Sequence, residues 1–316
     1  MEVSFIRAKF SVRLIAFAVD FLIMFVFGLI FVIAAQQILL NVPYYQKASN
    51  TLNEVELLSH LYSQSDTTED VISLADYYDP ETDEEYGTAQ SSLDEALTYF
   101  FSSSDFFTSS TEGQQIYTDI KLDSDYFIYA DESHTSIEVV DGTTNQDLFE
   151  FYQQVIKEDA LTYMMQYPQY VEAAKVLNLS FIFIILLIPI VLSVTIFELL
   201  VPCIFHRGYK TFGKLLFKLA VVDNRGLSPK FWVYFLRFII LLLVELILSL
   251  VTFIIPLVVS FSMFVFSKKQ QSFHDYMMGT YVVDASQTRV FINEKEYRKA
   301  MAEAAALDLK EDNIKY

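Results

Sequence analysis

The segment GYKTFGKL, residues 208–215, has the Gly-x-x-x-x-Gly-Lys spacing of a phosphate-binding P-loop. A P-loop joins a strand to a helix, and a Ser or Thr after its lysine binds Mg²⁺. Here Leu215 follows Lys214, and a long apolar run precedes the segment. We therefore expect no bound nucleotide, and nothing else in the sequence suggests a nucleic-acid partner.

Lysines in the same segment recur with helical spacing. Lys210, Lys214 and Lys218 are four residues apart, and the residues between them are largely apolar. This pattern is typical of a helix that lies on a membrane surface with its lysines toward anionic headgroups. The sequence therefore predicts a basic interfacial helix within the loop 206–230.

His274-Asp275 is the pair that most resembles part of a catalytic site. A catalytic dyad also needs a nucleophile and an orienting third group, and neither Gly-x-Ser-x-Gly nor His-Glu-x-x-His occurs. The 4 histidines are scattered, which argues against a metal site. We expect no enzyme, no metal and no cofactor. Asp275 is instead expected to cap a helix end or form a salt bridge, for which Arg13 is a candidate partner.

Asp20 and Glu245 are carboxylates inside long apolar runs. A charge at the bilayer centre costs about 2.5–3.5 kcal/mol, so each should face other helices or a wet cavity. Asp20 and Arg13 are about 10 Å apart along one helix, too far for a direct pair. Asp20 either binds a proton or cation, or forms a structural lock with an arginine such as Arg237. Glu245 is either a structural hydrogen-bonding group or a second titrating site paired with Asp20.

A third acidic residue, Glu198, lies near the end of the second apolar run. Its position favours the membrane interface, and a place along a transport path is the alternative.

Three long apolar runs must position these charges: Leu14–Leu40, Val176–Phe205 and Phe231–Phe266. Each exceeds the ~20 apolar residues that span a hydrocarbon core. The sequence therefore predicts an integral membrane protein whose partner is the lipid bilayer. The first run is much longer than the ~7–15 apolar residues of a signal peptide, so we expect it to remain as an anchor.

Charge is divided unevenly along the chain. Residues 41–175 hold 27 acidic and 4 basic residues, whereas basic residues cluster beside the apolar runs, at 7–13, 207–237 and 268–269. By the positive-inside rule the basic segments are cytoplasmic and 41–175 lies outside. The single cysteine allows no internal disulfide, which fits a bacterial surface better than a secretory pathway. We expect a multi-pass plasma-membrane protein with a cytoplasmic N-terminus.

The acidic segment 41–175 has the patterns of a small α+β domain. Helical spacing covers 44–64, 91–101 and 145–167, the last ending before Pro168. Alternation within 116–140 predicts two strands joined by a turn at 131–134. The acidic stretch 65–90 is expected to be a mobile loop.

The third apolar run has 36 residues, more than one ordinary span requires. Pro256 fits the first turn of a second helix. A single crossing would also place Lys268 and Lys269 outside, against the charge rule. We therefore favour a helical hairpin and four crossings in total, and three crossings remain an alternative.

Three segments of the chain resemble the RDD family of bacterial membrane proteins. They are VRLIAFAVDFLI at residues 12–23, GYKTFGKLLFKLAVVDNRGL at 208–227, and SFHDYMMGTYVV at 272–283, where Phe273 replaces the family's leucine. The resemblance implies that Arg13, Asp20 and Asp275 take the places of the family's arginine and two aspartates. It covers the membrane half only, with 41–175 as an insertion, and it implies transport of ions or small ligands.

These observations predict an all-α helical membrane bundle with a small α+β extracytoplasmic domain inserted after the first span. The expected divisions are the N-terminus and first span (1–40), the acidic domain (41–175), the second span (176–205), the basic loop (206–230), the hairpin (231–267) and a cytoplasmic tail (268–316). The expected function is a proton or monovalent-cation transporter, or a small-ligand transporter, acting with a homo-oligomeric or membrane partner subunit. The alternative is a non-catalytic scaffold that presents 41–175 to an extracytoplasmic protein.

Overall fold

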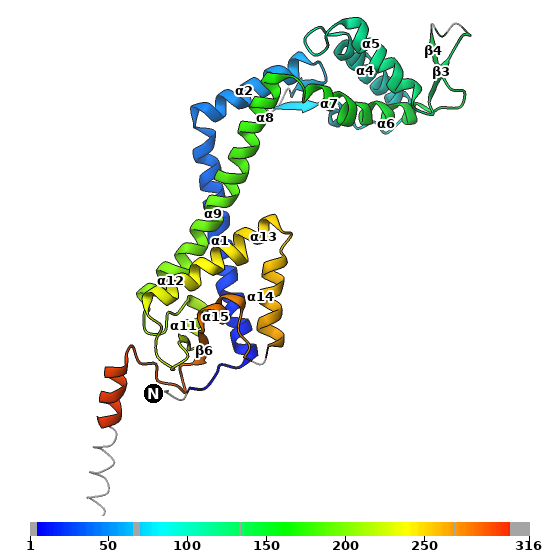
Figure 1. The fold of residues 1–316 in the computed structure, drawn as a ribbon. Helices are drawn as coiled ribbons and strands as arrows, with labels where there is room; N and C mark the ends of the chain where they lie inside the picture. The colour runs from blue at the N-terminus through cyan, green and yellow to red at the C-terminus, as the bar shows by residue number, and fades with distance from the viewer. Residues whose placement is uncertain (1–4, 66–69, 133, 135, 268, 304–316) are drawn as a thin grey trace, which may run out of the picture. The chain divides into compact units, whose positions relative to one another are not determined.

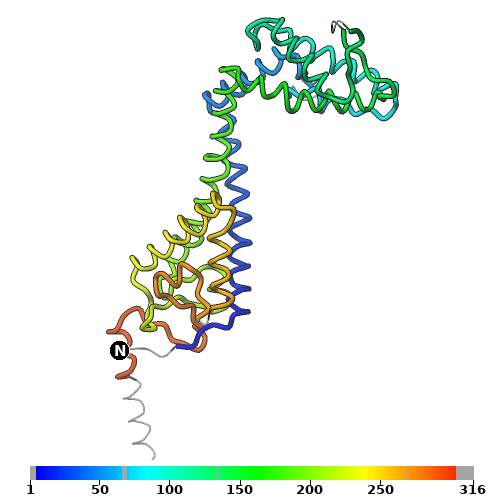
Figure 2. Tube along the Cα trace, turned by 45° about the vertical axis from the view of Figure 1, so that its right-hand side comes forward, coloured from blue at the N-terminus to red at the C-terminus, as the bar shows by residue number. Residues whose placement is uncertain are grey.

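The computed structural model describes residues 5–65, 70–132, 134, 136–267 and 269–303. The chain divides into two compact units, visible in Figures 1 and 2. Residues 1–36 and 183–316 form one, termed the membrane unit, and residues 37–182 form the other, termed the acidic unit.

The acidic unit is mainly helical. Its helices are α2 (Pro43–Leu58), α3 (Leu74–Tyr77), α4 (Asp83–Ser102), α5 (Ser110–Leu122), α6 (Asn145–Val155), α7 (Leu161–Met164) and α8 (Pro168–Ser180). Short antiparallel strand pairs join them: β1 (Tyr62–Gln64) with β2 (Val71–Ser73), and β3 (Phe127–Tyr129) with β4 (Ile137–Val139). A π-helical turn, Ile156–Ala160, makes α6 and α7 continuous.

Aromatic side chains form the core of the acidic unit. Phe100 and Phe101 of α4 are fully buried. Phe101 stacks on Tyr117 of α5, with ring centroids 5.0 Å apart. Phe127 of β3 packs on Phe151 of α6, with centroids 5.4 Å apart. Because each ring buries a large apolar area, this core can hold the unit together without a disulfide.

The α+β character of this segment and its β3–β4 hairpin agree with the sequence patterns, but two expectations were wrong. Residues 116–122 belong to helix α5 rather than to a strand. The stretch 65–90 contains β2, α3 and the start of α4 rather than only a loop. A capping box explains the early start of α4, because the Thr82 side chain accepts from the Glu85 amide and the Glu85 carboxylate bonds back to the Thr82 amide.

Within the described residues, three helices are long and apolar enough to cross a membrane. They are α1 (Phe10–Leu40), the helix Pro168–Ile204 that runs from α8 through α9 (Ile188–Thr195) to α10 (Val201–Ile204), and the helix Phe231–Val251 that runs from α12 (Phe231–Ile240) to α13 (Leu248–Val251). The Ser193 hydroxyl donates to the Met24 carbonyl over 2.7 Å and joins α9 to α1. A hydrogen bond of this kind supports helix association where no hydrophobic driving force acts between helices.

The third apolar run is a helical hairpin, as Pro256 predicted. The first leg ends at Val251, and the second leg is α14 (Ile255–Phe266). Phe253 and Ile254 have φ of 50° and 68°, so the chain reverses direction between the legs. Pro256 stands in the first turn of α14, where its missing amide proton removes no helical hydrogen bond.

Short elements pack at one end of these helices: α11 (Phe212–Leu216), β5 (Leu219–Val222), α15 (Phe273–Met278) and β6 (Tyr281–Asp284). Strands β5 and β6 are antiparallel, with Leu219 opposite Asp284. The membrane half is therefore not purely helical, and α15 and β6 are formed by residues assigned to the predicted tail 268–316.

The predicted basic helix over Lys210–Lys218 was wrong. The helical part is only the five residues of α11, which ends at Leu216. Lys218 has a φ of 54°, which is not a helical conformation. The next four residues are all buried and form β5. A short apolar run with two valines fits a buried strand, which the lysine spacing alone did not reveal.

Candidate functional site: buried charges of the membrane unit

Asp20 holds the segment Gly208–Lys214 against α1. The Thr211 hydroxyl donates to Asp20 Oδ2, and the Gly213 amide donates to Asp20 Oδ1 over 2.7 Å. Thr211 is also the N-cap of α11, where its side chain accepts from the Lys214 amide. Asp20 and Thr211 are both buried. The Asp20 carboxylate therefore has polar partners on both oxygens, which offsets part of the cost of burying it.

The two glycines of the P-loop-like spacing, Gly208 and Gly213, both have structural roles. A Cβ on Gly213 would lie 2.1 Å from the Ala16 carbonyl oxygen, so only glycine lets α11 approach α1 this closely. Gly208 has φ of +86°, and a Cβ there would lie 2.6 Å from the Ala220 Cβ. Both glycines therefore serve close packing, and neither points to a phosphate.

Lys214, which occupies the P-loop lysine position, faces a carboxylate. Its Nζ lies 3.9 Å from Glu198 Oε2, and both side chains are largely buried. The Tyr234 hydroxyl donates to the Glu198 backbone carbonyl over 2.9 Å. Glu198 thus lies inside the helix packing.

Arg237 and Asp275 form a buried ion pair between α12 and α15. Arg237 Nε donates to Asp275 Oδ1 over 2.7 Å, and the two residues are only 3% and 2% exposed. Thr280 and Ser272 donate their hydroxyls to the two Asp275 oxygens over 2.7 and 3.1 Å. Burial opposes ionisation of Asp275, but the Arg237 guanidinium outweighs it and holds the pKa of this carboxyl well below its ordinary value.

His274 connects this ion pair to Glu245. Its Nδ1 lies 2.8 Å from Glu245 Oε1, its backbone amide donates to the same oxygen over 2.8 Å, and its Nε2 lies 2.8 Å from Arg237 Nη2. A guanidinium only donates, so Nε2 accepts and the ring proton is on Nδ1, facing Glu245. His274 therefore links Arg237 to Glu245 through its two ring nitrogens.

Arg13 has a different partner from the one the sequence suggested. It donates to the backbone carbonyl of Gln270 and stacks over the Phe264 ring at 4.7 Å. Arg237 is bonded to Asp275, so the Asp20–Arg237 lock, one of the two alternatives for Asp20, is wrong. Arg13 acts on Asp275 through its charge but does not form the expected direct bridge. Glu245 is bonded to His274, so the structure shows the hydrogen bond that was one alternative for Glu245 and not the pairing with Asp20 that was the other.

The predicted charges thus fall into two hydrogen-bonded groups. One joins Asp20 to Thr211 and Gly213, beside the Lys214–Glu198 pair, and the other joins Arg237, Asp275, His274 and Glu245. Sequence reasoning missed Thr211 and His274 as members. Both lie within the segments that resemble the RDD family, and this location is the signal that could have identified them as members of the two groups.

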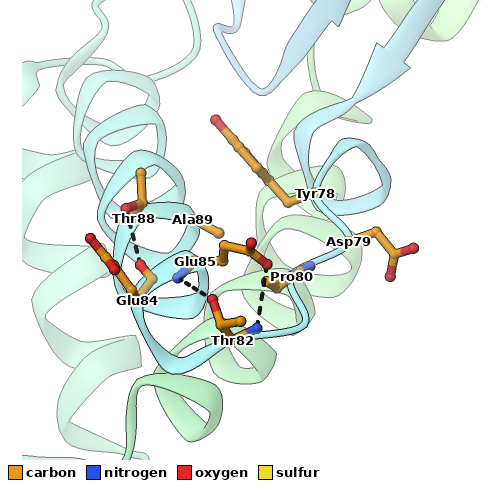
Figure 3. Close-up of a pocket in the computed structure, with 8 residues that line it drawn as sticks. All are labelled: Tyr78, Asp79, Pro80, Thr82, Glu84, Glu85, Thr88 and Ala89. Atoms are coloured by element: carbon orange, nitrogen blue, oxygen red, sulfur yellow. Dashed lines mark hydrogen bonds between the residues drawn. The ribbon is translucent and has the colours of Figure 1, made fainter.

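A surface hollow of about 470 Å³ lies in the acidic unit and is drawn in Figure 3. Its lining includes Asp79, Glu84 and Glu85. The Glu85 carboxylate accepts from the Glu81 and Thr82 amides over 2.8 and 3.3 Å, so it serves the start of α4. The hollow contains none of the buried charges described above.

Long apolar helices with ionisable groups buried between them define a helical membrane protein. The RDD family model matches residues 154–279, so the chain carries an RDD family domain, as the resemblance predicted. The matched segment includes Glu198, Arg237, Glu245 and Asp275, whereas Arg13 and Asp20 precede it. No curated protein and no solved structure matches the chain.

Proposed function

We propose that this membrane protein carries protons or monovalent cations across a bacterial plasma membrane, with Asp20 and Glu245 as its titrating groups. The observation that carries the proposal is the pair of buried hydrogen-bonded groups between the helices. Ionisable residues inside a membrane bundle are costly, and they commonly mark ion pathways and proton relays.

Asp20 suits a coupling role because its charge holds a separate segment in place. Neutralising the carboxylate weakens its hydrogen bonds from Thr211 and Gly213. Binding a proton or a small cation would thereby loosen the segment 208–214 from α1. The oxygens of Asp20 and Thr211 are also the hard donors that alkali cations prefer.

Glu245 suits proton exchange because His274 Nδ1 lies 2.8 Å from it. If Nε2 took up a proton in place of the hydrogen bond from Arg237, Nδ1 could release its own proton to the Glu245 carboxylate, and the ring would again carry one proton. Any change of charge at His274 also acts on Arg237, and through it on the α12–α15 contact. One protomer offers little room for a pathway, so we propose that a homo-oligomer or a partner subunit completes it.

The test is flux in liposomes that contain the purified protein. Internal pH is recorded on adding Na⁺, K⁺ or Li⁺, for wild type, Asp20→Asn, Glu245→Gln and empty vesicles. Glu84→Gln removes an exposed carboxylate of the acidic unit and is the matched control. We expect cation-dependent proton movement that both membrane-unit variants lose and the control keeps. A folded wild type with no flux above empty vesicles would overturn the proposal.

A second candidate function is a non-catalytic scaffold that presents residues 41–175 to a partner protein. The observation in its favour is that the acidic unit has its own aromatic core and carries 27 acidic against 4 basic residues. If this function is the relevant one, a cellular phenotype of losing the protein survives Asp20→Asn but not removal of residues 44–170. The opposite pattern would favour transport.

A further inference from the structure

The turn of the α13–α14 hairpin exposes a cap made almost entirely of apolar side chains. Phe253 is 95% exposed, and its neighbours are exposed too. The large exposed members are Leu250, Val251, Phe253, Ile254 and Ile255. The only polar side chain of the turn, Thr252, donates its hydroxyl back to the Leu248 carbonyl over 2.7 Å. A turn that ends at a membrane surface would ordinarily present polar or charged groups to water.

The second leg of the hairpin is too short to cross a bilayer. Helix α14 has 12 residues, about 18 Å of rise, against about 30 Å of hydrocarbon. Its C-terminal end lies beside the start of α1, because the Phe264 ring is 5.1 Å from the Phe10 ring and Arg13 stacks on it. From Phe264 back to Ile255 the rise is only about 14 Å.

The turn therefore lies beside the middle of α1 rather than its far end. Nine residues along α1 from Phe10–Arg13 reach the neighbourhood of Phe21, and the apolar run of α1 continues to Leu40. Figures 1 and 2 agree, since the α13–α14 turn stands level with the middle of α1 in both views.

Two backbone amides of the turn and one in the first turn of α14 have partners within the protein. The Ile254 amide donates to the Ser249 carbonyl over 2.8 Å, and the Ile255 amide donates to the Thr252 carbonyl over 3.3 Å. The Leu257 amide donates to the Ser249 hydroxyl over 3.1 Å. Non-helical backbone inside a bilayer requires such internal partners.

We infer that Phe231–Phe266 is a re-entrant hairpin: it enters the bilayer, turns among the lipid acyl chains near mid-depth, and leaves on the side from which it entered. Its partner is the acyl-chain region of the bilayer. On this account α1 and the helix Pro168–Ile204 cross the membrane, and Phe231–Val251 does not, although its length would allow it. The inference stands whether or not the protein transports ions.

Tryptophan fluorescence tests the depth of the turn. The chain has 1 tryptophan, Trp232, at the opposite end of the same helix and 69% exposed. Trp232→Phe with Phe253→Trp moves the reporter to the turn, and the wild type is the matched control. Both are reconstituted in phosphatidylcholine brominated either near the headgroup or near the end of the acyl chain.

For the Phe253→Trp protein we expect bromines near the end of the acyl chain to quench the fluorescence more than bromines near the headgroup. The ratio of deep to shallow quenching is then above one. Aqueous iodide should have little effect. For Trp232 we expect a ratio below one. Stronger quenching of the relocated tryptophan by shallow bromines or iodide would overturn the inference and favour a fourth crossing. Val251→Trp in the Trp232→Phe background repeats the test should the first variant fold poorly.

Cysteine labelling gives an independent answer. In a Cys203→Ser background, Phe253→Cys should resist a membrane-impermeant maleimide in sealed vesicles and also after they are opened. Ser91→Cys on the exposed face of α4 is the positive control. Rapid labelling of Phe253→Cys from either side would contradict the inference.

Discussion

The two units of this protein place apolar side chains in opposite ways. In the acidic unit large aromatic residues are buried, as with Phe100 and Phe101, and its charges are mostly exposed. In the membrane unit large apolar residues such as Phe21 and Phe25 face outward, and ion pairs such as Arg237–Asp275 are buried. The difference follows from the solvent, because lipid removes the hydrophobic drive that builds a core in water. Polar contacts must then specify how the helices fit together.

The largest expected effect comes from breaking the buried ion pair. Arg237→Met leaves Asp275 charged and buried without its partner, and should lower the free energy of unfolding by about 3–5 kcal/mol. The measurement is unfolding of the purified protein in mixed micelles with increasing denaturing detergent. The double variant Arg237→Met with Asp275→Leu should recover part of the loss, since it removes both charges. No difference between the single variant and wild type would contradict a role for this pair in holding α12 to α15.

Removing a core ring should have a comparable effect confined to the acidic unit. Phe101→Ala leaves a cavity beside Tyr117 and should cost about 3–4 kcal/mol. Urea unfolding followed by tyrosine circular dichroism measures it. Proton flux in liposomes should be unchanged where the acidic unit stays folded, because the variant touches none of the membrane-unit charges. An unchanged tyrosine signal together with a loss of flux would contradict the claim that the effect of this substitution is confined to the acidic unit.

A smaller effect is expected from adding a methyl group at the glycine that contacts α1. Gly213→Ala places a Cβ against the Ala16 carbonyl and should destabilise the membrane unit by about 1–3 kcal/mol. Gly87→Ala in α4 is the matched control, because its Cβ meets nothing closer than 3.4 Å. The control should be neutral or slightly stabilising, as alanine favours helix over glycine. The measurement is the unfolding midpoint of each variant in denaturing detergent. Equal shifts of the two midpoints would contradict the close approach of α11 to α1.

The smallest predicted effect is a pH dependence that arises in the acidic unit. Burial raises the pKa of Glu56 to about 7, above the ordinary value of 4.5. The folded state therefore holds a proton that the unfolded state has lost between pH 4.5 and 7, so stability falls as pH rises through this window. A pKa change from 4.5 to about 7 corresponds to at most about 3 kcal/mol, and solvent screening of the carboxyl group reduces the expected loss to about 1–2 kcal/mol, read from urea midpoints.

Glu56→Gln should flatten this profile without lowering stability at pH 5. Asp275 has the opposite sign, since its lowered pKa means that its contribution is present at neutral pH and lost only in strong acid. A profile of the Glu56→Gln variant identical to wild type would show that another group is responsible.

Much of the architecture was predictable from composition and spacing. The apolar runs gave the long helices, Pro256 marked the turn of the hairpin, and the segments at 208–227 and 272–283 pointed to the family whose model matches 154–279. These features depend on local sequence, so a single chain is enough to reveal them.

The partners of the buried charges were not predictable in the same way. Arg237 has several carboxylates within reach by topology alone, and only the packing of α15 against α12 selects Asp275 over Asp20. The strand β5 was missed because the spacing of the neighbouring lysines also fits a helix. Its strand conformation depends on pairing with β6, which is distant in the sequence. The role of Gly213 depends on the distance to Ala16, which no sequence pattern contains.

The central claim is that the carboxylates buried in the membrane unit exchange protons rather than only hold the helices together. Infrared difference spectra of the reconstituted protein, recorded between about pH 5 and 8, test it directly through the carbonyl-stretch band of protonated carboxyl groups. We predict a band that changes with pH and with added cation and that Asp20→Asn or Glu245→Gln removes. A folded protein whose spectra contain no band removed by either substitution would contradict the claim and leave these charges a structural role.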